Sequence, residues 1–135
     1  MPRKKRRPPG PEDRVRADHM LALAEEAIAE LAGVTMAEFA SKRLYQTSLA
    51  WYLQAIGEAA ARVSDESRAL VPGIPWKQVV GTRHILSHEY DRLLADKLWK
   101  VLRVHLPIMV TALRTHVHLL PASLAPGSMD APGKG

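Results

Sequence analysis

The stretch Leu49-Ala-Trp-Tyr-Leu-Gln-Ala-Ile-Gly-Glu-Ala-Ala-Ala-Arg-Val63 carries the clearest structural signal in this chain of 135 residues. Its apolar residues recur every three or four positions, which is typical of an amphipathic α-helix and not of a β-strand. Those residues are Leu49, Tyr52, Ile56, Ala59, Ala60 and Val63. Gly57 interrupts the helix at a cost of up to about 1 kcal/mol relative to Ala. We expect a neighbouring helix to approach closely at this glycine.

Helical spacing continues on the N-terminal side of this stretch. It predicts a first helix over residues 11–31, which Gly33 ends. Thr35 with Glu38 three residues later predicts a capping box at the start of the segment that leads into the central helix.

The C-terminal side also reads as helix, interrupted by prolines. Ser64 is the expected N-cap of a short turn over 65–70. Pro75 is expected as the first residue of the next helix, and Pro107 should kink or break a helical region over 93–120. Taken together, these patterns predict an all-α, up-and-down four-helix bundle with one extra short helix.

Charge divides the chain into a domain and two tails. Residues 1–10 hold five of the 19 Lys and Arg residues, whereas residues 11–120 hold 13 basic and 13 acidic residues. We therefore predict a disordered basic tail over 1–10, a helical domain over 11–120 and a disordered tail over 121–135. The basic tail is either a solvated arm or a weak phosphate-binding arm. The domain itself has no charge excess that would predict a broad basic face.

Several classes of protein are disfavoured by what the chain does not contain. It has no Cys, which excludes disulfides and thiolate metal sites. It has no apolar run near the roughly 20 residues that cross a bilayer, and its basic start lacks an apolar signal segment. The other histidines, His19, His105, His116 and His118, show no metal-ligand spacing. We expect a cytoplasmic protein with no metal, no cofactor and no membrane association.

The candidate site is Gly81-Thr-Arg-His-Ile-Leu-Ser-His-Glu-Tyr90. It combines a permanent cation, two imidazoles and a phenol, the groups needed for metal-free chemistry on a phosphodiester. On a straight helix Arg83 and His88 would lie about 140° apart, so they converge poorly. Convergence would require that the arginine side chain curls around, that the helix is distorted near Gly81, or that a second subunit completes the site.

The residue types assign roles for RNA cleavage. His88 would act as general acid or base, Arg83 would hold the phosphate as negative charge develops, and His84 would be an auxiliary polar group. Spacing alone favours a structural interpretation, in which Arg83 is ion-paired, His88 is an interior histidine and Tyr90 lies at the edge of the core.

Blocks of residues around the motif resemble the HepT-like group of the HEPN superfamily. The blocks are Ala55-Ile-Gly-Glu-Ala-Ala60, Val71-Pro-Gly-Ile-Pro-Trp76, Gly81-Thr-Arg-His84, His88-Glu-Tyr90 and Leu98-Trp99. The resemblance covers roughly residues 13–113. It implies an all-helical homodimer with its active site between protomers, acting as a metal-independent ribonuclease toxin with tRNA among the substrate classes.

The resemblance also implies site residues and a partner. The family motif of Arg, four residues, His, one residue and Tyr falls on Arg83, His88 and Tyr90. The implied antitoxin is a small MntA-like nucleotidyltransferase, which would transfer AMP to Tyr90 and so block RNA binding by charge and bulk. His84 stands where Asn is more usual in the family, and is a departure from its pattern.

Glu58 and Ser87 are candidate cleft-lining residues, and Glu58 could instead make an ordinary helix-surface contact. Tyr52, Trp76 and Trp99 are expected to pack in the core or at a dimer interface. An alternative function remains open from the sequence. The chain could be a non-catalytic helical dimer that docks a nucleotidyltransferase and binds nucleotide or RNA. Labelled RNA and purified, unmodified protein would separate the two functions.

Overall fold

The computed structural model describes residues 8–87 and 92–121, except the side chains of 85–87, 92 and 93. In chain order the elements are α1 (Pro11–Glu30), α2 (Met36–Ser41), α3 (Arg43–Ala61), α4 (Asp65–Ala69), α5 (Trp76–Gly81), the 3₁₀-helix η1 (Thr82–Ser87), α6 (Arg92–Lys100), the π-helical turn η2 (Val101–His105), α7 (Leu106–His116) and the 3₁₀ turn η3 (Val117–Leu119). Across these described ranges there is no strand, so the all-α prediction is confirmed.

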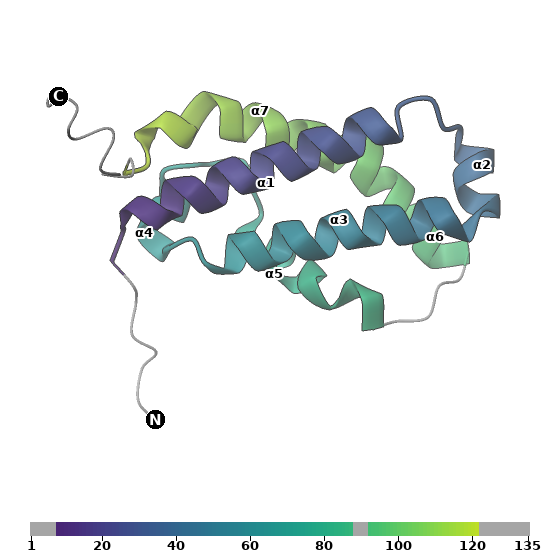
Figure 1. Ribbon diagram of the computed structural model, residues 1–135, viewed down its shortest axis with the longest axis horizontal. Coiled ribbons are helices and arrows are strands. Elements are labelled where there is room, and N and C mark those ends of the chain that lie inside the picture. Colours follow the sequence, from purple (N-terminus) through teal and green to yellow (C-terminus); the bar gives the residue numbers. More distant parts are fainter. Residues whose placement is uncertain (1–7, 88–91, 122–135) are drawn as a thin grey trace, which may run out of the picture.

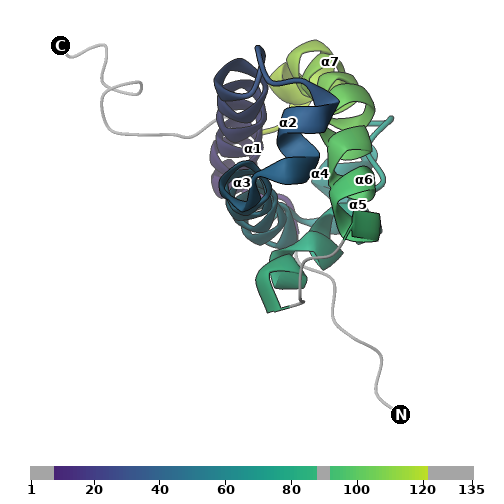
Figure 2. The same cartoon turned by 90° about the vertical axis from the view of Figure 1, so that its right-hand side faces the viewer.

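The two long helices α1 and α3 lie side by side and run in opposite directions (Figure 1). Viewed along the bundle, α1 and α3 occupy one side, α6 and α7 occupy the other, and α2 crosses the near end (Figure 2). The α5–η1 segment packs on the outer side of α3. The candidate motif therefore begins on a segment that rests on the central helix.

The core lies between these helices. Its largest fully buried side chains are Phe39, Met20, Leu49, Ile56, Leu98, Leu102, Leu106 and Leu113. The aromatic residues expected to pack do so: Tyr52 is buried, and Trp99 is half-buried with its ring 5.5 Å from that of Phe39. Burial, followed by hydrogen bonds to Glu30 and Glu26, raises the pKa of Tyr52 to about 12.

Local signals at the helix starts are confirmed. Thr35 Oγ1 accepts from the Glu38 amide at 3.1 Å, and Glu38 Oε1 accepts from the Thr35 amide at 3.0 Å. These two bonds form the predicted capping box. Ser64 caps α4, because its Oγ accepts from the Ser67 amide at 3.2 Å. The prediction for Pro75 was wrong by one residue, because α5 begins at Trp76 and Pro75 is its N-cap, not its first helical residue.

Pro107 breaks the last helical region, as predicted. Proline has no N–H and its ring crowds the carbonyl four residues earlier. The chain responds with the π-helical turn η2, in which the Leu106 amide donates to the Val101 carbonyl, and α7 then begins at Leu106. Arg103 on this turn lies over the Trp99 ring at 4.5 Å and donates to the Val34 carbonyl at 2.7 Å. The turn is thereby held against the segment that follows α1.

Candidate functional site

The motif segment changes helix type where it meets α3. The α-helix α5 ends at Gly81, and the chain continues as the 3₁₀-helix η1 from Thr82. Thr82 Oγ1 lies 2.9 Å from the Leu53 carbonyl oxygen and 2.7 Å from the Val79 carbonyl oxygen, so one hydroxyl bonds both α3 and the end of α5. On a straight helix Arg83 and His88 converge poorly, and a helix distorted near Gly81 is one of the three arrangements that would bring them together.

Gly57 makes this close packing possible. A Cβ built on Gly57 would lie 2.8 Å from the Arg83 amide nitrogen, 2.9 Å from the Val79 carbonyl oxygen and 3.0 Å from Thr82 Oγ1. Real Cβ atoms essentially never come within 3.0 Å of such atoms, and two of the three belong to backbone. The expectation of a close approach at this glycine is confirmed, and the approaching segment is the one that carries Arg83.

The predicted site residues are only partly visible. Arg83 is half-buried on η1, and His84 is exposed beside it. Ser87 is the last residue of η1, and its side chain lies outside the described part. His88 and Tyr90 lie outside the described residues. Whether Arg83 and His88 converge therefore stays a prediction.

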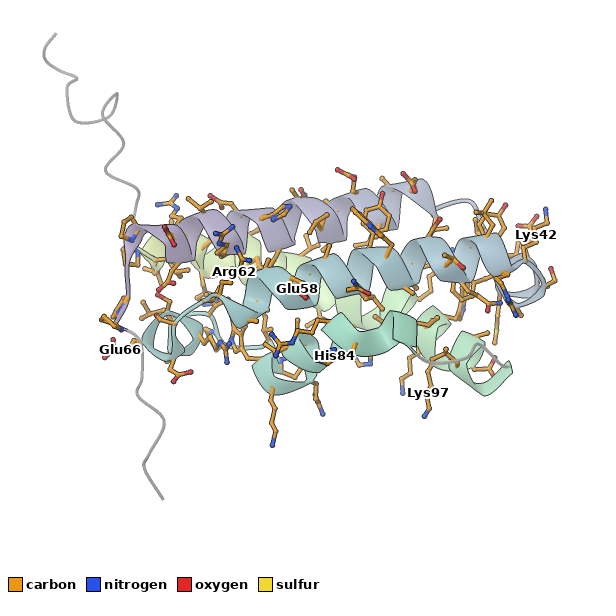
Figure 3. The ribbon with its side chains drawn as sticks, turned by 60° about the horizontal axis from the view of Figure 1, so that its bottom comes forward. Lys42, Glu58, Arg62, Glu66, His84 and Lys97 are labelled. Carbon is orange, nitrogen blue, oxygen red and sulfur yellow. The ribbon has the colours of Figure 1, made fainter. Side chains whose placement is uncertain are left out.

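Glu58 is exposed on α3, directly after Gly57. Figure 3 shows Glu58 and Arg62 of α3 and His84 of η1 on the same face of the molecule. Glu58 lines a hollow of about 290 Å³ between α1 and α3. The lining residues are Arg16, His19, Ala55, Glu58, Ala59 and Arg62. Reasoning from the sequence missed this hollow, because charged residues three or four apart on a helix normally indicate a solvated face.

The described part of the chain holds neither a metal-ligand cluster nor a membrane span. Over residues 8–87 and 92–121, no group of three or more His, Asp or Glu side chains is placed to hold a metal ion. His88 of the motif lies outside that range, so the metal independence of the site stays a prediction. None of the helices in those ranges is long and apolar enough to span a bilayer.

A buried carboxylate that the sequence did not reveal ties the start of α1 to α4. Asp13 is 4% exposed, and it accepts from the Ser64 amide at 3.1 Å, from the Ser64 and Ser67 hydroxyls at 2.6 Å each, and from the Gly10 amide at 3.3 Å. Burial acts to raise the pKa of Asp13, but these bonds outweigh it and hold the pKa below its usual value. The group stabilises the scaffold, at the end of the bundle where α3 finishes.

Comparisons with known proteins agree on one family. A family model described as "Ribonuclease HepT-like" matches residues 21–115, a range that includes Arg83, His88 and Tyr90. A protein of Methanocaldococcus jannaschii that is named as an RNase is 30% identical over 88 residues, which are 65% of this chain and 81% of that protein. Another protein named as an RNase, from Caldanaerobacter subterraneus subsp. tengcongensis, is 27% identical over 90 residues, or 67% and 80% of the two chains.

A third relative, named as a ribonuclease HepT of Thermococcus cleftensis, is 33% identical over 55 residues, which are 41% of this chain and 50% of the relative. No solved structure matches the chain.

Proposed function

We propose that this chain, which belongs to the HepT-like ribonuclease family, is the toxin of a toxin–antitoxin pair. It cleaves RNA, with tRNA as the substrate class. The cleavage needs no metal ion. The single observation that supports the site assignment is the close packing of η1 against Gly57. Two backbone atoms and a hydroxyl pack against this glycine, so the Arg83 backbone lies close against α3. A fixed backbone is what a phosphate-holding arginine requires.

The proposed reaction is an internal transfer at phosphorus. A base takes the proton of the ribose 2′-hydroxyl, and the 2′-oxygen attacks the adjacent phosphorus. The bond to the 5′-oxygen then breaks, and that oxygen receives a proton from an acid. The products are a 2′,3′-cyclic phosphate and a 5′-hydroxyl. His88 acts as the acid or the base, and the Arg83 guanidinium stabilises the charged phosphorane.

The second proton-transfer group is proposed to come from a second copy of the chain. In a homodimer whose two-fold axis passes beside η1, one shared cleft would contain both copies of Arg83 and His88. His84 and Ser87 would lie at the edge of this cleft, and Glu58 would face it from α3. The exposed apolar side chains in the N-terminal half of α3, Leu44 and Trp51, form the proposed dimer surface.

Replacing His88 tests the catalytic assignment. We expect His88→Ala to lower cleavage of labelled RNA at least a hundredfold, since general acid–base catalysis typically contributes 10² to 10⁴. The dimer, measured by light scattering, should remain. A chelator such as EDTA should leave wild-type cleavage unchanged. Undiminished cleavage by the variant would remove His88 from the mechanism, and strict dependence on Mg²⁺ would contradict metal-free chemistry.

Tyr90 is proposed as the point of control in the cytoplasm. An MntA-like nucleotidyltransferase would transfer AMP to its phenol, adding negative charge beside Arg83 and competing with RNA phosphate. With that enzyme and ATP, we expect wild-type protein to gain mass in AMP units and to lose RNA cleavage. Tyr90→Phe should gain no mass and stay active. Modification of the Phe variant would place the acceptor elsewhere.

A further inference from the structure

The hollow between α1 and α3, here called the α1–α3 groove, has an excess of positive charge. Arg16 and His19 line it from α1, and Glu58 and Arg62 line it from α3. Two guanidinium groups and an imidazole thus face a single carboxylate. Because residues 11–120 hold equal numbers of acidic and basic residues, this excess is a local feature of the groove. Its volume of about 290 Å³ leaves room for a ligand.

Arg16 has a donor without an acceptor. Its Nε is buried and has no hydrogen-bond partner among the described residues. Buried donors in folded proteins are nearly always satisfied, because leaving one unpaired destabilises the fold. Neither Arg16 nor Arg62 forms a salt bridge within the described ranges, so Glu58 does not neutralise them. The two guanidinium groups are therefore unpaired among the described residues, although the Glu58 carboxylate lines the same groove.

The groove and the motif flank the same helix. Glu58 lines the groove, whereas its neighbour Gly57 touches the Arg83 amide. Arg62, Glu58 and His84 all lie on one face of the molecule (Figure 3). An α-helix with its side chains is about 10–12 Å across, so a short stretch of single-stranded nucleic acid can extend over α3 from one side to the other.

From these observations we propose that the α1–α3 groove is a second phosphate subsite, which holds an RNA backbone phosphate outside the one that is cleaved. The inference rests on the proposed ribonuclease function. Arg16 and Arg62 donate to the phosphate oxygens, and His19 adds a third donor at the rim. Glu58 repels phosphate from the ridge of α3, so the backbone is held on either side of this residue. The subsite thus positions the strand relative to Arg83.

The test measures how RNA affinity depends on salt. Binding of a labelled single-stranded RNA is followed from low to moderate salt in the His88→Ala background, which prevents cleavage. Adding Arg16→Gln with Arg62→Gln should weaken binding several-fold at low salt and reduce the slope of log K against log salt by about 0.7 for each phosphate that the protein no longer binds. The matched control is Lys42→Gln with Lys100→Gln, which removes the same charge from exposed positions away from the groove and should lower the slope less.

Glu58→Gln is the complementary variant, because removing the carboxylate should tighten RNA binding, a gain that misfolding cannot mimic. An unchanged slope in the arginine variant, or no gain with Glu58→Gln, would overturn the subsite. If the arginine variant instead loses its dimer, the groove is a protein contact and the proposal fails. Wild-type cleavage is measured on the same RNA. If the wild type cleaves this RNA but the arginine variant shows an unaltered salt slope, only the subsite is wrong. If the wild type neither binds nor cleaves the RNA, the proposed function is wrong as well.

Discussion

At the scale of single residues, Asp13 illustrates how a buried charge fixes a scaffold. Its carboxylate accepts four hydrogen bonds, from Gly10, Ser67 and both donors of Ser64. Ser64 and Ser67 are themselves buried, so these groups depend on one another for their polar contacts. The bonds join the first turn of α1 to α4, which follows the C-terminal end of α3.

Asp13→Asn should lower the free energy of unfolding at pH 7 by about 2 kcal/mol, because an amide cannot accept all these bonds. The lowered pKa of Asp13 also sets a pH dependence. A carboxyl whose folded pKa is depressed stabilises fully above its unfolded pKa of about 4, and this contribution is lost as pH falls through the folded value. Urea unfolding between pH 7 and pH 2 should therefore show a shallower acid loss for the variant. The exposed Asp18→Asn is the control, and equal losses in both variants would contradict this role of Asp13.

At the scale of elements, the contact between α3 and η1 is decided by one missing side chain. Gly57→Ala would gain up to about 1 kcal/mol in helix propensity. Its Cβ, however, would press on backbone atoms of Val79 and Arg83, and such overpacking typically costs about 1–3 kcal/mol. We expect a net loss of stability. We also expect at least tenfold slower RNA cleavage. A displacement of a catalytic group by about 1 Å can slow a reaction about a hundredfold, even where stability changes little.

Gly81→Ala is the matched comparison, since a Cβ at Gly81 would meet nothing within 4 Å and the residue ends α5. Thermal unfolding should show this variant to be as stable as the wild type or more so. If Gly57→Ala has the thermal stability and the RNA cleavage rate of the wild type, the position of η1 does not depend on its close contact with Gly57.

How much of these elements is visible in the sequence depends on how far apart the partners are. The capping box of Thr35 and Glu38 and the break at Pro107 are local, and both were predicted. The need for a close approach at Gly57 was also evident, but not which atoms approach. The change to a 3₁₀-helix at Thr82 depends on a carbonyl of α3, 29 residues earlier. Likewise the groove that joins Arg16 to Arg62 exists only once α1 and α3 lie side by side.

At the scale of the whole molecule, α3 and α7 expose the most accessible of the large apolar side chains in the described ranges. On α3, Leu44 is 73% exposed and Trp51 is 54% exposed, and their spacing of seven residues places both on one side of the helix, with Glu58 a further seven along. On α7, Ile108 is 52% exposed beside a hollow of about 390 Å³. Exposed apolar surface of this kind often marks a protein contact. The α3 stripe lies on the helix against which η1 packs, so a two-fold axis there would bring two motifs together.

We therefore expect Trp51→Glu to dissociate the proposed dimer, because a carboxylate at a self-complementary apolar contact meets its own copy across the axis. The monomer should stay folded, since this side chain lies at the surface. RNA cleavage should fall together with the dimer, because the proposed cleft is built from both copies. Light scattering over a range of concentrations, with cleavage assayed at each, checks both expectations. Ile108→Glu places the same charge on the α7 surface and should leave the dimer intact. If Ile108→Glu separates the subunits and Trp51→Glu does not, the dimer forms through α7, and the active site is not shared across α3.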